Sequence, residues 1–216
     1  MAMPVSIRKS NMELLRLMSM FLVLVIHANT AYQPWPIDQT AVQAVPVQCF
    51  FRFLIESLCI VCVNAFVLLS GWFGIKFSFK RLLSFIFQVL FFSLVLCLLP
   101  NRYGRNLLID IVTLYQYWFV RAYIILFILS PALNLFVEHA SKKVFQNVLI
   151  AFFVMQTVFS YISNSSRFDD GFSPIPFLGL YLLSRYIRIY QPKFATLKKT
   201  SRFVCLHGNL HPNRNF

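Results

Sequence analysis

The chain has 216 residues, of which 58% are hydrophobic and only 12% are charged, against about 25% charged residues in a typical soluble domain. A soluble helical protein of this composition would expose apolar patches that monomers do not tolerate, so the composition indicates an integral membrane protein. The formal net charge of +13 comes from cations placed singly or in pairs between apolar runs, which argues against nucleic-acid binding and favours orientation in a bilayer.

Six apolar segments follow one another along the chain, and each approaches the roughly 20 residues that a membrane-spanning helix needs. We place them at 14–32, 49–71, 82–99, 115–136, 144–162 and 174–190. Polar or turn-rich stretches join them. The sequence therefore predicts an all-α fold, a polytopic helical membrane protein of about six transmembrane helices.

The cations between the segments predict a cytoplasmic amino terminus, because this orientation places most of them on the inner side of the membrane. The first segment is similar to a cleaved signal peptide, but Glu13 and Arg16 interrupt its junction, so we predict a retained helix. The inner cations are Arg8, Lys9, Lys76, Lys80, Arg81, Lys142, Lys143, Lys193, Lys198, Lys199 and Arg202, and the outer ones are Arg102, Arg105 and Arg167.

Two ionisable residues, Arg16 and His27, lie in the first segment. Their separation of eleven residues corresponds to three helical turns plus about 20°, so both side chains share one face, with a rise of about 16 Å between them. Ionisable groups inside a bilayer are costly and mark cavities, pairs or chemistry. Arg16 suits the binding of phosphate or carbonyl groups and His27 the removal of a proton from a hydroxyl group. The alternatives are an interfacial anchor for Arg16 and a structural role for His27.

Glu56 lies in the second segment at a depth similar to that of His27 and is a candidate to orient the imidazole. It is otherwise a neutral, hydrogen-bonded acid or a group that faces the outer headgroups beside Arg52. Arg121, near the outer end of the fourth segment, is interpreted as an interfacial anchor.

The cysteines and histidines predict no metal site and no disulfide framework. Cys59 and Cys62 form a C-x-x-C inside an apolar run, where small buried residues packing between helices are the better interpretation. Cys205, His207 and His211 supply three candidate ligands without a fourth.

Three stretches resemble the membrane-bound acyltransferase family 3, which O-acylates polysaccharides, lipopolysaccharide and other cell-surface glycans. Arg16 and His27 match its R-x10-H signature. "VNAFVLLSGWFGIKFSFKRL", residues 63–82, looks like its second span and the basic cytoplasmic loop that follows. "YWFVRAYIILFILSPALN", residues 117–134, resembles its fourth span.

The resemblance implies transfer of an acyl group, usually acetyl, from acyl-CoA to a hydroxyl of a cell-surface polysaccharide or glycolipid at the bacterial inner membrane. Acyl-CoA would be a co-substrate, with no tightly bound cofactor and no nucleic acid as partner. His27 would be the general base and Arg16 a donor-side group. Ser70 matches the serine of the Ser-Gly pair in the family. Three cations of the following loop would either attract the CoA phosphates or only orient the loop on the cytoplasmic side, and these are Lys76, Lys80 and Arg81.

The resemblance also predicts the organisation of the chain. We assign residues 1–192 to the membrane-embedded acyltransferase domain and residues 193–216 to a non-membrane tail, frameshifted or disordered, because members of the family commonly have more spans. Two other functions stay open: a transporter or flippase of glycan intermediates with His27 and Glu56 as a proton relay, and an inactive fragment of the acyltransferase.

Overall fold

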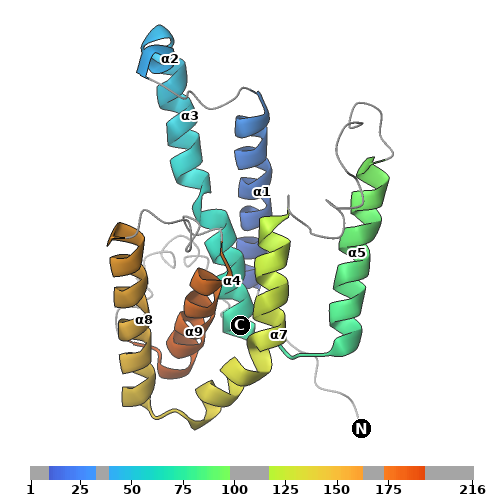
Figure 1. Cartoon of the computed structure of the whole chain (residues 1–216), viewed down its shortest axis with the longest axis vertical. Coiled ribbons are helices and arrows are strands. Elements are labelled where there is room, and N and C mark those ends of the chain that lie inside the picture. The colour runs from blue at the N-terminus through green and yellow to red at the C-terminus, as the bar shows by residue number, and fades with distance from the viewer. Residues whose placement is uncertain (1–9, 33–38, 98–116, 163–172, 193–216) are drawn as a thin grey trace, which may run out of the picture.

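The computed structural model describes residues 10–32, 39–97, 117–162 and 173–192. All regular secondary structure within these ranges is helical, which confirms the predicted all-α fold. The tail predicted at 193–216 lies outside the described residues. The helices are α1 (Ser10–Tyr32), α2 (Gln39–Ala44), α3 (Pro46–Cys59), α4 (Val61–Phe73), α5 (Phe79–Cys97), α7 (Trp118–His139), α8 (Lys142–Ile162) and α9 (Pro174–Tyr190) (Figure 1).

Each of the six predicted segments corresponds to helical structure. Among the residues that the structure describes, three helical segments are long and apolar enough to cross a membrane by length and composition. These three are Asn11–Thr30, Pro46–Phe73 and Trp118–His139. The second is made of two helices, because α3 ends at Cys59 and α4 begins at Val61, with Ile60 between them. α9 has 17 residues, at the lower end of the range of about 17 to 25 residues that span a bilayer.

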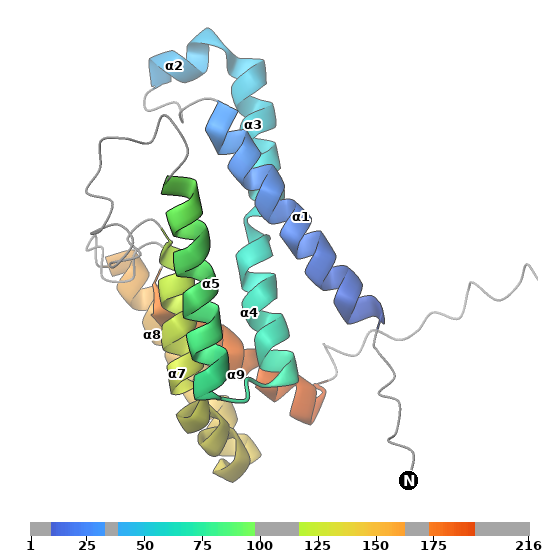
Figure 2. The same ribbon diagram turned by 90° about the vertical axis from the view of Figure 1, so that its right-hand side faces the viewer.

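The packing centre of the molecule is α9, which lies against α4, α7 and α8 (Figure 1). Its Phe177 and Tyr181 are fully buried, together with Val67 of α4, Leu126 of α7 and Phe145 of α8. α1 packs on α3 and α4, and the α2–α3 end of the molecule extends beyond the other helices together with the carboxyl end of α1 (Figures 1 and 2). Large apolar side chains are exposed on the outside, as a lipid-facing surface requires.

A glycine allows α4 and α9 to approach closely. A Cβ atom on Gly71 would lie 2.6 Å from the backbone oxygen of Tyr181 and 2.9 Å from Cβ of Ser184. The Ser184 hydroxyl donates a hydrogen bond to the Leu68 carbonyl at this crossing. Residue 71 therefore has to be glycine for the two backbones to meet as they do.

The loop from α4 to α5 is held tightly at its first residue. Gly74 has φ of 76°, a left-handed conformation that glycine adopts without strain. Its N–H donates to the Ser70 and Gly71 carbonyls at 2.9 Å and 3.2 Å. The chain thus leaves α4 in a sharp turn, and the next residue, Ile75, is hydrogen-bonded to Tyr181 of α9 and Asn134 of α7.

Candidate active site

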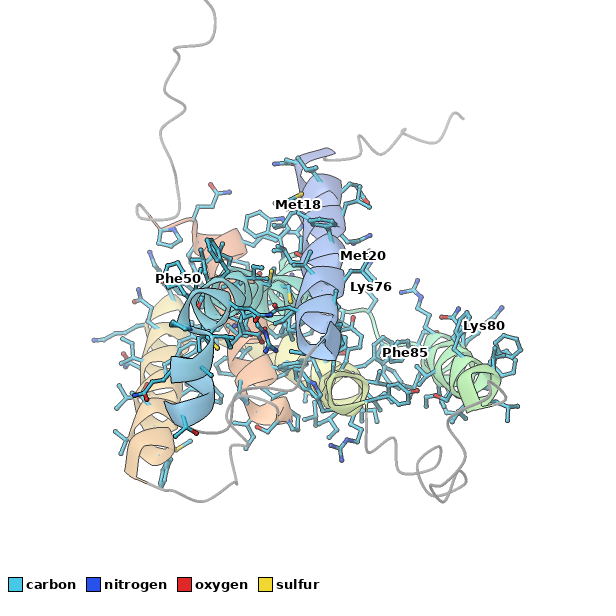
Figure 3. The ribbon with its side chains drawn as sticks, turned by 90° about the horizontal axis from the view of Figure 1, so that it is seen from above. Met18, Met20, Phe50, Lys76, Lys80 and Phe85 are labelled. Carbon is cyan, nitrogen blue, oxygen red and sulfur yellow. The ribbon has the colours of Figure 1, made fainter. Side chains whose placement is uncertain are left out.

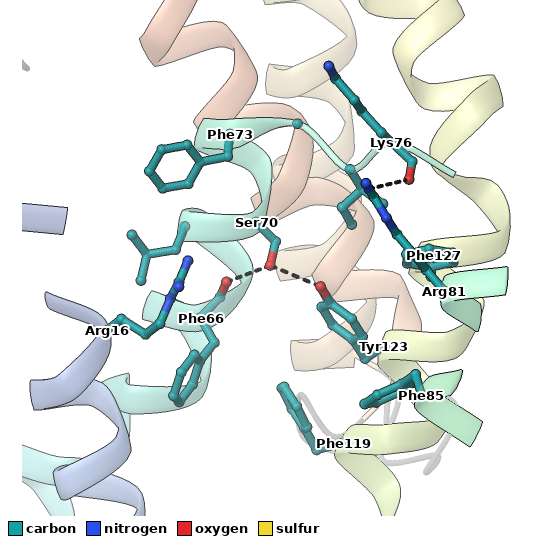
Figure 4. Close-up of a pocket in the computed structure, with 13 residues that line it drawn as sticks. Arg16, Phe66, Ser70, Phe73, Lys76, Arg81, Phe85, Phe119, Tyr123 and Phe127 are labelled. Carbon is teal, nitrogen blue, oxygen red and sulfur yellow. Dashed lines mark hydrogen bonds between the residues drawn. The ribbon is translucent and has the colours of Figure 1, made fainter. Parts of the chain in front are cut away.

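Arg16 and His27 lie on the α4 side of α1, as the spacing predicts, but they line two different pockets. The first, which we call the basic pocket, has a volume of about 500 Å³ (Figure 4). It lies between α1, α4, α5 and α7. It is lined by Arg16, Phe66, Leu69, Ser70, Phe73, Gly74, Ile75, Lys76, Arg81, Phe85, Phe119, Tyr123 and Phe127.

Three cations from three separate elements line the basic pocket, and none of its lining residues is acidic. Arg16 comes from α1, Lys76 from the α4–α5 loop and Arg81 from the first turn of α5. Arg16 lies 3.7 Å from the Glu13 carboxylate, but both side chains are nearly half exposed, so the pair is weak. The pocket is therefore suited to an anion with several charges.

Aromatic side chains form much of the rest of this wall. Phe119 stacks on Tyr123 with ring centroids 5.9 Å apart, and Phe85 meets Tyr123 edge-on at 5.8 Å. The Ser70 hydroxyl donates to the Phe66 carbonyl at 3.0 Å, so its oxygen accepts from the Tyr123 hydroxyl at 3.3 Å (Figure 4). Sequence reasoning gave Tyr123 no role, although the residue belongs to the stretch that resembles the fourth span.

The second cavity, which we call the histidine pocket, has a volume of about 350 Å³. It lies between α1, α3, α4 and the start of α7. Both residues predicted at this depth, His27 and Glu56, belong to it. Its lining residues are Val23, Ile26, His27, Thr30, Glu56, Ile60, Cys62, Val63, Asn64 and Trp118.

The tautomer of the neutral His27 ring is set by its own helix. Nδ1 lies 2.8 Å from the Val23 carbonyl oxygen, which can only accept, so Nδ1 carries the proton. The neutral ring then bears its lone pair on Nε2. The residue is exposed at the pocket. His27 is therefore able to take a proton from a hydroxyl group that enters the pocket.

Glu56 is held by a residue that the sequence did not single out. Asn29 donates from Nδ2 to Glu56 Oε2 at 3.3 Å and to the Arg52 carbonyl at 3.2 Å, which ties α1 to α3. His27 and Glu56 line the same pocket, but each is hydrogen-bonded to another residue. The ring of His27 bonds to the Val23 carbonyl, and the carboxylate of Glu56 accepts from Asn29, so Glu56 does not orient the imidazole through this bond. A catalytic role of Glu56 stays a prediction.

Of the predicted site residues, Lys80 lies apart from both pockets. It lines neither pocket and is exposed on α5, on the other side of the helix from Phe85 (Figure 3). Arg121 is likewise exposed on α7 and lines neither pocket. In the part of the chain that the structure describes, no group of His, Cys, Asp or Glu could hold a metal ion. Cys59 and Cys62 are free, buried thiols.

The two pockets are three turns apart along α1 at Arg16 and His27, but their linings come within one helical turn of each other on α4 and α7. On α4, Val63 lines the histidine pocket and Phe66 the basic pocket, and on α7 the neighbours Trp118 and Phe119 divide in the same way. The rings of Phe66 and Phe119, with centroids 6.4 Å apart, lie on the far side of Ser70 from Phe73 (Figure 4). One helix bundle thus presents a cationic cavity and a histidine-containing cavity in succession.

Comparison with known proteins identifies the family. The family model described as an acyltransferase domain, acyltransferase family 3, matches residues 9–208. The match contains every residue that lines the two pockets and continues past the boundary predicted at residue 192. No curated protein and no solved structure gives a significant match. The chain belongs to acyltransferase family 3 and is a membrane acyltransferase in the general sense of that family.

Proposed function

We propose that the protein transfers an acyl group, acetyl in the simplest case, from acyl-CoA to a hydroxyl of a cell-surface polysaccharide or glycolipid at the bacterial inner membrane. The observation that carries this proposal is the placement of His27. Its Nδ1 is occupied by Val23, which leaves Nε2 for a substrate proton, and the basic pocket begins on the same helix face three turns away.

The donor would bind in the basic pocket. Acyl-CoA carries several phosphate groups, and Arg16, Lys76 and Arg81 supply three positive charges around one cavity. The fork of an arginine matches phosphate oxygens, and aromatic walls offer flat surfaces to the adenine ring. Ser70 and Tyr123 add hydroxyl groups to this wall.

The chemistry would take place at the histidine pocket. His27 Nε2 takes the proton of the acceptor hydroxyl while the hydroxyl oxygen attacks the thioester carbon, so a C–O bond forms and the C–S bond breaks. The imidazolium then returns the proton to the leaving CoA thiolate, and the base is regenerated. Glu56 in the same pocket would stabilise the transient positive charge on the ring.

The test is O-acetyl content in a host that displays the acceptor glycan, measured by NMR of the purified glycan. We expect His27→Ala and Arg16→Ala to lower it strongly, because a positioned base contributes about 10²- to 10⁴-fold to the rate. His139→Ala is the matched control. The ring of His139 makes the same type of bond, to the Leu135 carbonyl at 2.9 Å, and lines neither pocket.

Other outcomes would contradict the proposal. Glycan that reaches the surface only when His27 is intact, but carries no acetyl group, would indicate a transporter. Absence of acetylation with the natural sequence, at normal protein levels on an immunoblot, would indicate an inactive fragment. Equal losses in His139→Ala and His27→Ala would remove the argument for a specific base.

A further inference from the structure

A closed ring of hydrogen bonds joins α7, α9 and the α4–α5 loop. The Tyr181 hydroxyl donates to Asn134 Oδ1 at 2.6 Å, and Asn134 Nδ2 donates to the Ile75 carbonyl at 2.8 Å. The Ile75 N–H donates in turn to the Tyr181 hydroxyl oxygen at 3.1 Å. Tyr181 is fully buried and Ile75 is 7% exposed, so the bond between the Ile75 N–H and Tyr181 is shielded from water, whereas Asn134 is partly buried.

Both backbone groups of Ile75 are satisfied by this ring, which fixes the peptide units on either side of the residue. Ile75 lies directly before Lys76, and both residues line the basic pocket. The preceding residue, Gly74, is fixed by its own bonds to the end of α4. A loop that would otherwise be free to move is therefore held in one conformation at the point where it presents a cation.

The physical consequence concerns the cost of binding an anion. A buried donor or acceptor that loses its partner raises the free energy of the protein. Any other conformation of the loop would break bonds of the ring and is therefore higher in free energy. A cation on a fixed loop loses less conformational entropy when it meets a phosphate than one on a mobile loop. The ring thus preorganises the basic pocket, although two of its three members, Tyr181 and Asn134, do not line that pocket.

We infer that Tyr181 and Asn134 are positioning residues of the donor site, which act on acyl-CoA through the Ile75–Lys76 segment. The inference rests on the proposed function for the identity of the anion. It gives α9 a second role beside packing, because its most buried aromatic residue is hydrogen-bonded to the loop of a pocket that α9 itself does not line.

The central variant is Tyr181→Phe in the full chain, which keeps the ring and removes only the hydroxyl group. We expect the Kd for CoA, measured by isothermal titration calorimetry on the detergent-purified protein, to rise roughly three- to tenfold. Tyr186→Phe is the control. Tyr186 is also buried on α9, at 6% exposure, and its hydroxyl takes no part in the ring.

Double variants separate positioning from general damage. If Tyr181 acts through Lys76, then Tyr181→Phe adds little to the loss already caused by Lys76→Ala. Arg16 lies on α1, away from the loop. The loss of affinity for CoA in Arg16→Ala should therefore add to the loss of affinity in Tyr181→Phe. An unchanged Kd in Tyr181→Phe, or full additivity with Lys76→Ala, would overturn the inference.

Amide hydrogen exchange tests the anchoring without any ligand. The peptide that contains residues 74–78 should exchange faster in Tyr181→Phe than in Tyr186→Phe or the natural protein, because the Ile75 N–H loses its partner. Unchanged exchange would overturn the inference itself. If the natural protein did not bind CoA while exchange responded as expected, the donor proposal would fail, and with it the role of the ring toward CoA.

Discussion

His27 is oriented by the backbone of its own helix, so the tautomer of its ring does not depend on a carboxylate. The Val23 carbonyl four residues earlier accepts from Nδ1, so Nε2 is available whatever the charge of Glu56. Glu56 is positioned independently by Asn29. The contribution of the carboxylate to the proposed reaction is therefore electrostatic, toward the imidazolium, and not a matter of holding the ring.

This division predicts the behaviour of Glu56→Gln. Glutamine retains an oxygen that accepts from Asn29, so the pocket keeps its shape while the negative charge is lost. We expect kcat for acyl transfer to fall about tenfold with KM for acyl-CoA unchanged, because a nearby opposite charge stabilises the imidazolium by ~1.4 kcal/mol. Asn29→Ala tests the position of the same carboxylate. A kcat equal to that of the natural protein in Glu56→Gln would contradict the electrostatic role.

Residues of the site were predictable from the sequence where their relation is local. Arg16 and His27 share a face because helix geometry fixes the angle between residues eleven apart. Tyr181 and Ile75 are 106 residues apart in sequence, and no periodicity within either segment relates them. Asn134 belongs to a stretch that resembles the family, but its bond to the Ile75 carbonyl depends on where the tertiary packing places α7 relative to the α4–α5 loop.

At the scale of elements, the contact between α4 and α9 determines where the basic pocket is. Gly71 lies beside Ser70, which lines the pocket, and it packs against the backbone of Tyr181, which anchors the loop. The same close approach therefore supports the fold and places two groups of the site. Docking of α9 and affinity for the donor should change together.

Gly71→Ala is expected to destabilise the protein by about 1 to 3 kcal/mol, because the new methyl group would lie 2.6 Å from a backbone oxygen that cannot rotate away. Gly179→Ala is the comparison. Its Cβ would meet the ring of Phe152, a side chain that is able to turn. The unfolding midpoint in detergent should therefore fall further for Gly71→Ala, and the reverse order would show that α9 is free to shift away from α4.

The elements themselves were largely predictable, since long apolar runs of helical length were found at all six expected places. The division of 49–71 into α3 and α4 was not. Ile60, the one residue between them, is apolar and carries no turn signal of its own, so the apolar pattern runs through the break. Pro46 at the first turn of α3 is a start signal that the predicted boundary at residue 49 missed.

At the scale of the whole molecule, the two pockets lie toward opposite ends of α1. The basic pocket includes Arg16, in the second turn of the helix, and the histidine pocket includes His27, near its carboxyl end. The positive-inside rule predicts that the amino-terminal end faces the cytoplasm. Donor and acceptor would then approach one bundle from opposite sides of the membrane.

This arrangement predicts sided use of the donor. In sealed inverted membrane vesicles, where the cytoplasmic face is outside, radiolabelled acetyl-CoA added to the medium should acetylate the glycan, because the charged donor reaches the basic pocket directly. In sealed right-side-out vesicles it should not, since a molecule with several phosphate charges does not cross the bilayer. Permeabilising the right-side-out vesicles with detergent is the control and should restore the reaction. Acetylation by intact right-side-out vesicles would place the donor on the side of His27 and reverse the roles proposed for the two pockets.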